Sequence, residues 1–155
     1  MTSKRCFLLA CFFILCAQAS ARETSVSIVE RPDDANERVF MSDSPLPYGK
    51  TLYVADKDPG RGSVFYFTSS RSDADIVLKK PWESPRAAAL RVYFYNRDPG
   101  YVTSVYVTDS SVGYGTTVYF SDDDPGYGKA LYVQDERLRE RKKALAVMLM
   151  LLGEL

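Results

Sequence analysis

One apolar phrase recurs through this chain at a nearly constant spacing, and it constrains the fold more than any other feature. Each copy is an aliphatic–aromatic–aliphatic triplet, then a small polar residue and an acidic turn, as in 118–124. Successive triplets lie 13 residues apart, with one step of 14, and start at Val39, Leu52, Phe65, Leu78, Val92, Val105, Val118 and Leu131. Because a copy this short cannot bury its apolar side alone, the copies must pack together into one structure.

The triplets predict strands, and the segments between them predict turns. The triplet residues are β-branched or aromatic, which favours strands, whereas Asp-Pro-Gly recurs at 58–60, 98–100 and 124–126. Asp accepts hydrogen bonds from nearby backbone amides, Pro fixes φ and Gly accepts positive φ, so this tripeptide is typical of turns. One turn per unit leaves room for two short strands. We therefore expect an all-β domain of compact 13-residue repeats over residues 39–135.

The first 21 residues predict export. Lys4 and Arg5 precede an apolar stretch, residues 6–17, and small residues follow it up to Ala21. This is the layout of a secretory signal peptide, and the stretch is too short to span a bilayer. We expect cleavage after Ala21 and a periplasmic or extracellular protein with no transmembrane segment. A lipoprotein anchored at Cys11 is the alternative, although the apolar region before that residue is short.

Three segments of the chain differ in composition from the regular repeats. Residues 22–38 are polar and predict a lead-in with one short strand at 26–29. Two prolines and the single tryptophan interrupt the fourth copy at 79–86, which predicts a loop or an edge segment there. Residues 136–155 are rich in Arg, Lys, Leu, Met and Ala, and they predict a C-terminal helix.

The predicted mature chain lacks the residue types on which many enzymes depend. Histidine is absent, and all three cysteines lie in the predicted signal peptide. This excludes the usual zinc ligands and the Cys–His and Ser–His nucleophile pairs. Without the signal peptide, 18 basic residues stand against 20 acidic ones, so no basic field attracts nucleic acid. Paired carboxylates among Asp73, Asp75 and Glu83 are the remaining catalytic alternative, and we expect no enzyme.

The pattern (Val/Leu)-Tyr-(Val/Phe)-x-Asp, followed by a turn and the next triplet, resembles the septoil-knot family. Members of that family repeat a phrase close to Tyr-x-Ala-Asp-x-x-Val-Tyr, which this chain keeps best at 72–77. The resemblance covers residues 39–135, with Asp-Pro-Gly turns in place of the family's Ala-Asp. It implies a deeply knotted all-β domain, wound as a seven-crossing torus knot, and brings no catalytic residues. We expect such a domain to be kinetically stable.

The acidic turns have two interpretations. Carboxylates beside Gly-containing turns offer the oxygen ligands that calcium requires, and they are Asp56, Asp58, Asp122, Asp123 and Asp124. Asp is also favoured in turns for its own hydrogen bonds, and the ligand spacing of an EF-hand or a calcium-binding β-helix is missing. We expect no cofactor under the second interpretation and calcium under the first.

Five aromatic residues are predicted to be exposed. Tyr48, Tyr101, Tyr114 and Tyr127 lie beside turns, and Trp82 lies in the interrupted copy. Aromatic rings with a polar tip suit contact with a protein or a glycan. The tyrosines at the centre of the triplets are expected to pack within the domain instead.

The C-terminal helix has three interpretations. It packs onto the domain or caps its open end; it pairs with a second copy in a homodimer; or it lies on a membrane surface, aided by the basic residues of 137–143. The pairing residues share one helical face and are Leu145, Met148, Leu149 and Leu152. The sequence predicts an exported, non-enzymatic binding or structural module with an unknown protein or glycan partner. The alternative is a calcium-dependent surface or carbohydrate-binding adhesion module.

Overall fold

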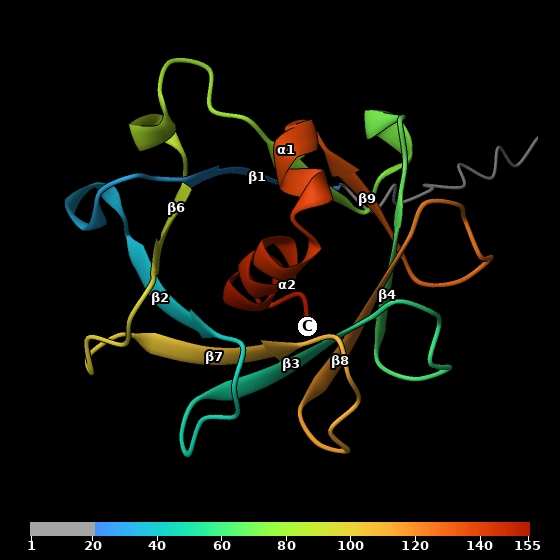
Figure 1. The fold of residues 1–155 in the computed structure, drawn as a ribbon. Helices are drawn as coiled ribbons and strands as arrows, with labels where there is room; N and C mark the ends of the chain where they lie inside the picture. The colour runs from blue at the N-terminus through green and yellow to red at the C-terminus, as the bar shows by residue number, and fades with distance from the viewer. Residues whose placement is uncertain (1–20) are drawn as a thin grey trace, which may run out of the picture.

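Residues 21–155, which the computed structural model describes, form a closed ring of nine strands around a central helix (Figure 1). The predicted signal peptide, 1–21, lies outside the described residues apart from Ala21. The strands are β1 (Arg22–Ile28), β2 (Glu37–Ser42), β3 (Lys50–Ala55), β4 (Ser63–Phe67), β5 (Ile76–Lys79), β6 (Leu90–Tyr95), β7 (Thr103–Thr108), β8 (Thr116–Ser121) and β9 (Lys129–Val133). The helices are α1 (Glu136–Glu140) and α2 (Lys142–Leu151), with short 3-10 turns η1 (Pro32–Asp34), η2 (Arg71–Asp73) and η3 (Pro85–Ala87).

The strands of the ring are interleaved. Around the ring the order is β1-β5-β9-β4-β8-β3-β7-β2-β6, and all nine pairs are parallel. Each strand therefore lies two positions from the strand that precedes it in the sequence. The chain runs nearly twice around the ring, and β6–β9 of the second circuit fill the gaps left by β1–β5 of the first. The predicted all-β fold with a C-terminal helix is confirmed.

Most strands pair with their two neighbours through staggered, partly overlapping stretches, whereas the short β5 uses the same residues on both sides. In β2, residues 37–40 pair with β6 and residues 39–42 pair with β7. This stagger inclines the strands steeply and brings the end of one strand close to the start of the next strand in sequence. Most of the repeat units therefore contain one strand and one connection of about seven residues. The expectation of two short strands per unit is wrong, because the turn residues and those around them are needed for that connection.

The inward side chains of the ring are those that the repeat predicts. The first residue of every triplet, from Val39 to Leu131, is at most 1% exposed. Val26 lies one period before Val39 and is buried too. The predicted lead-in is therefore wrong in part, because β1 is a ninth strand that pairs with β5 and β6 and closes the ring. This copy is hard to recognise in the sequence because Ser27 stands at the centre of its triplet, where most other copies have an aromatic residue.

The interrupted fourth copy still contributes a strand. β5 pairs with β1 on one side and with β9 on the other. Pro81, Trp82 and Pro85 all follow it, in the connection to β6. The predicted loop is therefore right for residues 80–86, whereas Lys79 is the last residue of a strand within the ring. The prolines are tolerated because they lie beyond the last paired residue.

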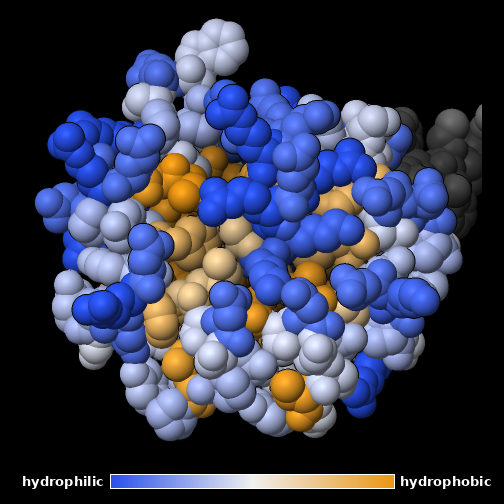
Figure 2. All heavy atoms as spheres, in the orientation of Figure 1, coloured by the Kyte–Doolittle hydropathy of each residue, from blue (hydrophilic) through white to orange (hydrophobic). Residues whose placement is uncertain are grey.

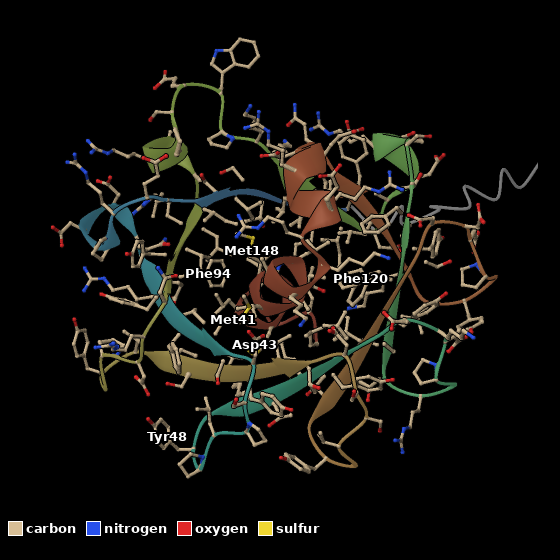
Figure 3. All side chains as sticks on the ribbon, viewed as in Figure 1. Met41, Asp43, Tyr48, Phe94, Phe120 and Met148 are labelled. Atoms are coloured by element: carbon tan, nitrogen blue, oxygen red, sulfur yellow. The ribbon has the colours of Figure 1, made fainter. Side chains whose placement is uncertain are left out.

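The helix α2 lies inside the ring of strands and forms the centre of the core. Six consecutive residues, 144–149, are buried, so every face of this helix is covered. Figure 3 shows Met148 at the centre of the barrel, with Met41, Phe94 and Phe120 around it. Of the three interpretations of the C-terminal segment, packing onto its own domain is confirmed.

The predicted pairing face of the helix is wrong. Leu145, Met148 and Leu149 are fully buried within the barrel, and Leu152 is half-buried at its end. These side chains are therefore not available to a second copy, nor do they offer an apolar face to a membrane surface. None of the helices in residues 21–155 is long and apolar enough to cross a membrane.

Both ends of the helical segment are attached to the barrel. The predicted helix is divided at Arg141, so that α1 lies across one end of the barrel and α2 runs inward (Figure 1). At the other end, the Glu154 carboxylate accepts hydrogen bonds from Arg22 at 2.7 Å and from Lys129 at 3.0 Å. These two residues begin β1 and β9, so one carboxylate joins the chain end to both strands.

A carboxylate on β1 makes the stability of the ring dependent on pH. The ion pairs of Glu23 with Lys79 and Arg71 lower the pKa of this carboxyl below its ordinary value of 4.5. A lowered pKa stabilises the fold above the unfolded-state pKa, and this stabilisation is lost as the pH falls through the folded-state pKa. We expect Glu23→Gln to lower the free energy of unfolding at pH 7 and to have no effect near pH 2.

Urea unfolding of both proteins across this pH range measures the difference. Glu37→Gln is the matched control, because Glu37 also lies on a strand and has no ion pair among the described residues. A difference between Glu23→Gln and the native protein that stays constant from pH 7 to about pH 2 contradicts the ion-pair interpretation.

Candidate functional site

Five seven-residue loops lie next to one another around the ring. They are 96–102, 43–49, 109–115, 56–62 and 122–128, in that spatial order, because the strands that they connect are adjacent in the ring. We call these five loops the tyrosine arc. The connections 29–36, 68–75 and 80–89, which contain the 3-10 turns, occupy the other side of the ring. In Figure 1 the arc loops project outward from the lower left of the barrel, through the bottom, to its right side.

Four of the arc loops carry an exposed tyrosine at the same place. The side chains of Tyr101, Tyr48, Tyr114 and Tyr127 follow one another around the arc and are 72%, 57%, 59% and 50% exposed. Arg61 occupies this place in the remaining loop. The predicted exposure of all four tyrosines is therefore confirmed. Their order around the arc differs from their order in the chain, because the two circuits interleave.

The arc loops overlap because a glycine at the end of each of four loops passes over a neighbouring strand. A Cβ atom on Gly115 would lie 2.6 Å from the carbonyl oxygen of Thr51, and one on Gly128 would lie 2.6 Å from that of Val64. Gly49 and Gly62 make similar close approaches. Each of these four loops thus ends against the start of a strand. That strand is the one into which the adjacent arc loop leads. Within each pair, Gly49 with Gly62 and Gly115 with Gly128, the glycines lie 13 residues apart, which is the signal in the sequence that indicates these close approaches.

The Asp-Pro-Gly tripeptides fold as the sequence predicts. The Oδ1 atoms of Asp58, Asp98 and Asp124 each accept a hydrogen bond from the backbone N–H two residues later, at 2.7 Å. A turn closed in this way needs little further ordering when a partner binds. The arc is therefore a set of preorganised loops on a rigid barrel, an arrangement common in binding proteins.

One hydrogen bond joins two adjacent arc loops. The Tyr48 hydroxyl donates to Oδ2 of Asp98, and this bond lowers the pKa of the Asp98 carboxyl and raises that of Tyr48. The neighbouring Tyr101 hydroxyl raises the pKa of Tyr95. The Tyr48 hydroxyl is thus held, while the rings of Tyr48 and Tyr101 stay exposed.

The five aspartates that the sequence offered as calcium ligands lie in two arc loops. Asp58 and Asp124 each use one oxygen to close a turn, and Asp122 accepts a hydrogen bond from Arg139 at 3.0 Å. Within residues 21–155, no three His, Cys, Asp or Glu side chains come together as a metal site. The turn interpretation therefore accounts for their positions, and calcium binding stays a prediction.

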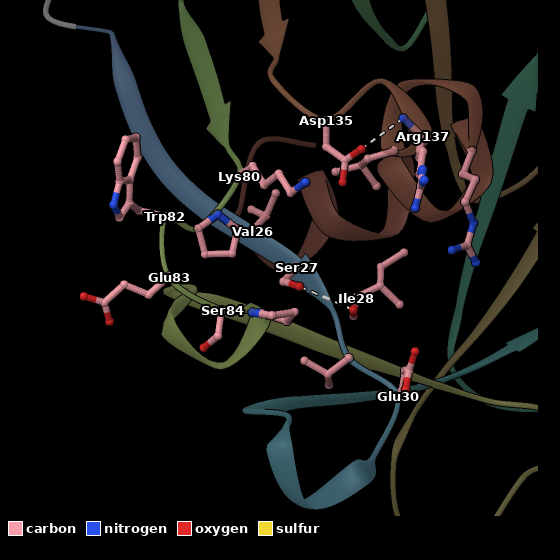
Figure 4. Close-up of a pocket in the computed structure, with 15 residues that line it drawn as sticks. Val26, Ser27, Ile28, Glu30, Lys80, Trp82, Glu83, Ser84, Asp135 and Arg137 are labelled. Atoms are coloured by element: carbon pink, nitrogen blue, oxygen red, sulfur yellow. Dashed lines mark hydrogen bonds between the residues drawn. The ribbon is translucent and has the colours of Figure 1, made fainter.

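Trp82 lies apart from the arc, at the edge of a groove of about 650 Å³ (Figure 4). The tryptophan is 99% exposed, as predicted. The groove lies between the end of β1, the 80–85 segment and α1. Its charged side chains are evenly mixed and favour no ligand charge: Lys80, Arg137 and Arg141 against Glu30, Glu83 and Asp135.

The carboxylates of the catalytic alternative serve different parts of the fold. Oδ2 of Asp75 accepts a hydrogen bond from the backbone N–H of Ala130 at 2.7 Å, and Oδ1 of Asn36 binds Arg91 in the same way. These side chains precede β5 and β2, at the position that glycine holds in four arc loops. Glu83 lies in another connection, at the groove. The Asp75 carboxylate therefore already accepts a structural hydrogen bond, and a catalytic role would have to use the same group.

The face that carries α1 shows no continuous apolar patch. Hydrophilic side chains cover most of it, and apolar residues are visible in areas between them (Figure 2). Arg139 stacks over the Phe67 ring at 4.4 Å, and Lys143 pairs with Asp109 at 3.0 Å. The basic residues of the helical segment are thus partly engaged by the barrel itself.

No protein-family model matches the chain. No curated protein and no solved structure matches it either. The resemblance to the septoil-knot family, with the knot that it implies, stays a prediction.

Proposed function

We propose that this chain is an exported, non-enzymatic binding module whose contact surface is the tyrosine arc. The observation that carries the proposal is the presence of an exposed tyrosine at the same place in four of the five neighbouring arc loops. Tyrosine gives a large contact area at a low cost in conformational entropy, and it is enriched where proteins bind their partners. Because α2 occupies the centre of the barrel, a partner must bind on its outside, where the arc loops project.

The winding of the chain supports a second part of the proposal, which is slow unfolding. Separation of any two neighbouring strands breaks contacts between distant parts of the sequence, and α2 must leave the ring before the core is exposed. Such a barrier gives kinetic stability without disulfide bonds, which suits a protein outside the cytoplasm. The same interleaved circuits support the proposed membership of the septoil-knot family.

Binding to the cell envelope of the producing organism tests the arc. The variant carries Tyr48→Ser, Tyr101→Ser, Tyr114→Ser and Tyr127→Ser, and the purified exported protein is sedimented with the envelope fraction. We expect at least a tenfold loss of affinity, because each central tyrosine contributes about 1 kcal/mol or more at such surfaces. The melting temperature should be unchanged, since all four rings are exposed.

Trp82→Ser is the matched control, because it removes an exposed aromatic ring on the other side of the barrel. Its binding should equal that of the native protein. Full binding by the four-serine variant, or loss of binding by Trp82→Ser alone, contradicts the proposal and in the second case points to the groove. Addition of a calcium chelator distinguishes the calcium-dependent adhesion module, whose binding would be abolished.

A further inference from the structure

The arc carries a net negative charge in a chain that is neutral as a whole. Its five loops hold three basic residues, Lys57, Arg61 and Arg97, against eight aspartates: Asp43, Asp56, Asp58, Asp98, Asp109, Asp122, Asp123 and Asp124. The whole chain has equal numbers of acidic and basic residues, so this excess is local. A surface with such a field repels nucleic acid and anionic lipid and attracts basic partners.

The arc already binds basic side chains of its own chain. Lys143 of α2 lies 3.0 Å from Asp109 and 3.9 Å from Asp43, which belong to two adjacent arc loops. Arg139 of α1 pairs with Asp122 of a third loop at 3.0 Å and stacks over the Phe67 ring at 4.4 Å. The inner edge of the arc therefore holds a basic polypeptide segment by carboxylates and an aromatic face together.

Four further carboxylates of the arc, Asp56, Asp58, Asp123 and Asp124, have no ion pair among residues 21–155. The exposed tyrosine rings lie in the same or adjacent loops. An arginine or lysine between a carboxylate and an aromatic ring gains both an ion pair and a cation–π contact. This is the combination that Arg139 makes inside the molecule.

We propose that the partner of the tyrosine arc is an arginine- and lysine-rich polypeptide segment. This inference rests on the proposed binding function of the arc and names the chemistry of its partner. The partner lies along the arc loops, with its cations beside Asp56, Asp58, Asp123 and Asp124 and over the neighbouring tyrosines. Its association is electrostatically steered and falls with ionic strength.

Fluorescence anisotropy with labelled peptides tests the proposal on the exported protein. The probe is a peptide of alternating arginine and glycine, and the comparison peptides carry citrulline or glutamate in place of arginine. We expect the arginine peptide to bind about tenfold more tightly than the citrulline peptide. The binding should weaken strongly at about 0.5 M NaCl. Equal binding of the arginine and citrulline peptides overturns the inference.

A charge variant assigns the binding to the arc. Asp56→Asn, Asp58→Asn, Asp123→Asn and Asp124→Asn together remove four charges, while the amide oxygen of asparagine still closes the turns at Gly60 and Gly126. We expect about a tenfold loss of arginine-peptide binding. Asp33→Asn with Asp73→Asn, on the other side of the ring, is the control and should bind as the native protein does. Unchanged binding by the four-asparagine variant overturns the inference.

The two proposals fail in different ways. If the four-serine variant loses envelope binding but the arginine peptide does not bind, the arc is a binding surface and its partner is not basic. Tyrosine-dependent binding to a neutral glycan array would then identify a glycan as the partner. If the arginine peptide binds the four-serine and native proteins equally, the tyrosines have no part in this contact and the inference is wrong.

Discussion

Truncation of Leu145 to alanine is expected to lower the free energy of unfolding by about 2–5 kcal/mol. Leu145 is fully buried in α2, at the centre of the barrel. Removal of its side chain leaves a cavity, and the cost of a cavity depends on how well its walls can collapse. Here the wall is a closed ring in which every strand is paired on both sides. We therefore expect a cost near the upper end of this range.

Urea unfolding followed by far-ultraviolet circular dichroism measures this effect. Intrinsic fluorescence would report little, because the single tryptophan, Trp82, is 99% exposed. Arg141→Ala is the control at the start of the same helix, since Arg141 is exposed and has no ion pair among residues 21–155. It should change the free energy of unfolding by less than about 0.5 kcal/mol. Equal effects of the two substitutions would show that α2 does not form the core.

The same variant tests slow unfolding in a second experiment, proteolysis under native conditions. Digestion by a dilute protease under native conditions should take hours for the native protein, because the core opens only after α2 leaves the ring. Leu145→Ala should shorten this time, since the helix then contributes less to the barrier. Complete digestion of the native protein within minutes contradicts the proposed kinetic stability.

Replacement of Gly115 by alanine is expected to destabilise the fold by about 2–5 kcal/mol. Gly115 has a φ of +87°, which costs a residue with a Cβ about 1–2 kcal/mol. Its Cβ would also lie 2.6 Å from the carbonyl oxygen of Thr51, an atom of a paired strand that cannot move without breaking the ring. This overpacking adds about 1–3 kcal/mol.

Gly113 is a matched control two residues away. Its φ is +77°, but a Cβ there would meet no atom within 4 Å. Gly113→Ala should therefore cost only the conformational term, about 1–2 kcal/mol. Thermal or urea unfolding of both variants gives the difference, and Gly126→Ala with Gly128→Ala repeats the comparison in another loop. Equal destabilisation within each pair would contradict the close crossing of loop and strand.

The repeat alone predicts much of the local structure. Strands at the triplets, turns at the Asp-Pro-Gly tripeptides and exposed tyrosines beside them all follow from residue type and period, and all are confirmed. These features depend on a few neighbouring residues, and so they can be predicted from short stretches of sequence. The catalytic and calcium alternatives were open because carboxylates are equally suited to turns.

The helix shows where pattern analysis is insufficient. Leu145, Met148, Leu149 and Leu152 share a helical face, and this periodicity suggested an interface. Alanine and valine complete the other faces, Ala144, Ala146 and Val147, and all three are buried as well. Small side chains on the remaining faces allow a helix to fit within a ring of strands. Periodicity alone does not tell such a helix from one that packs by a single face.

The sequence by itself determined the unit of this protein, which is a strand-forming triplet followed by a turn, and the exposure of its loop tyrosines. The tertiary structure decided which units are neighbours. Because each strand takes the ring position two places along, residues 53 apart, such as Tyr48 and Tyr101, come to adjacent loops. Nothing within a 13-residue unit encodes that step, since it arises from the stagger of the strands and from the helix that fills the ring.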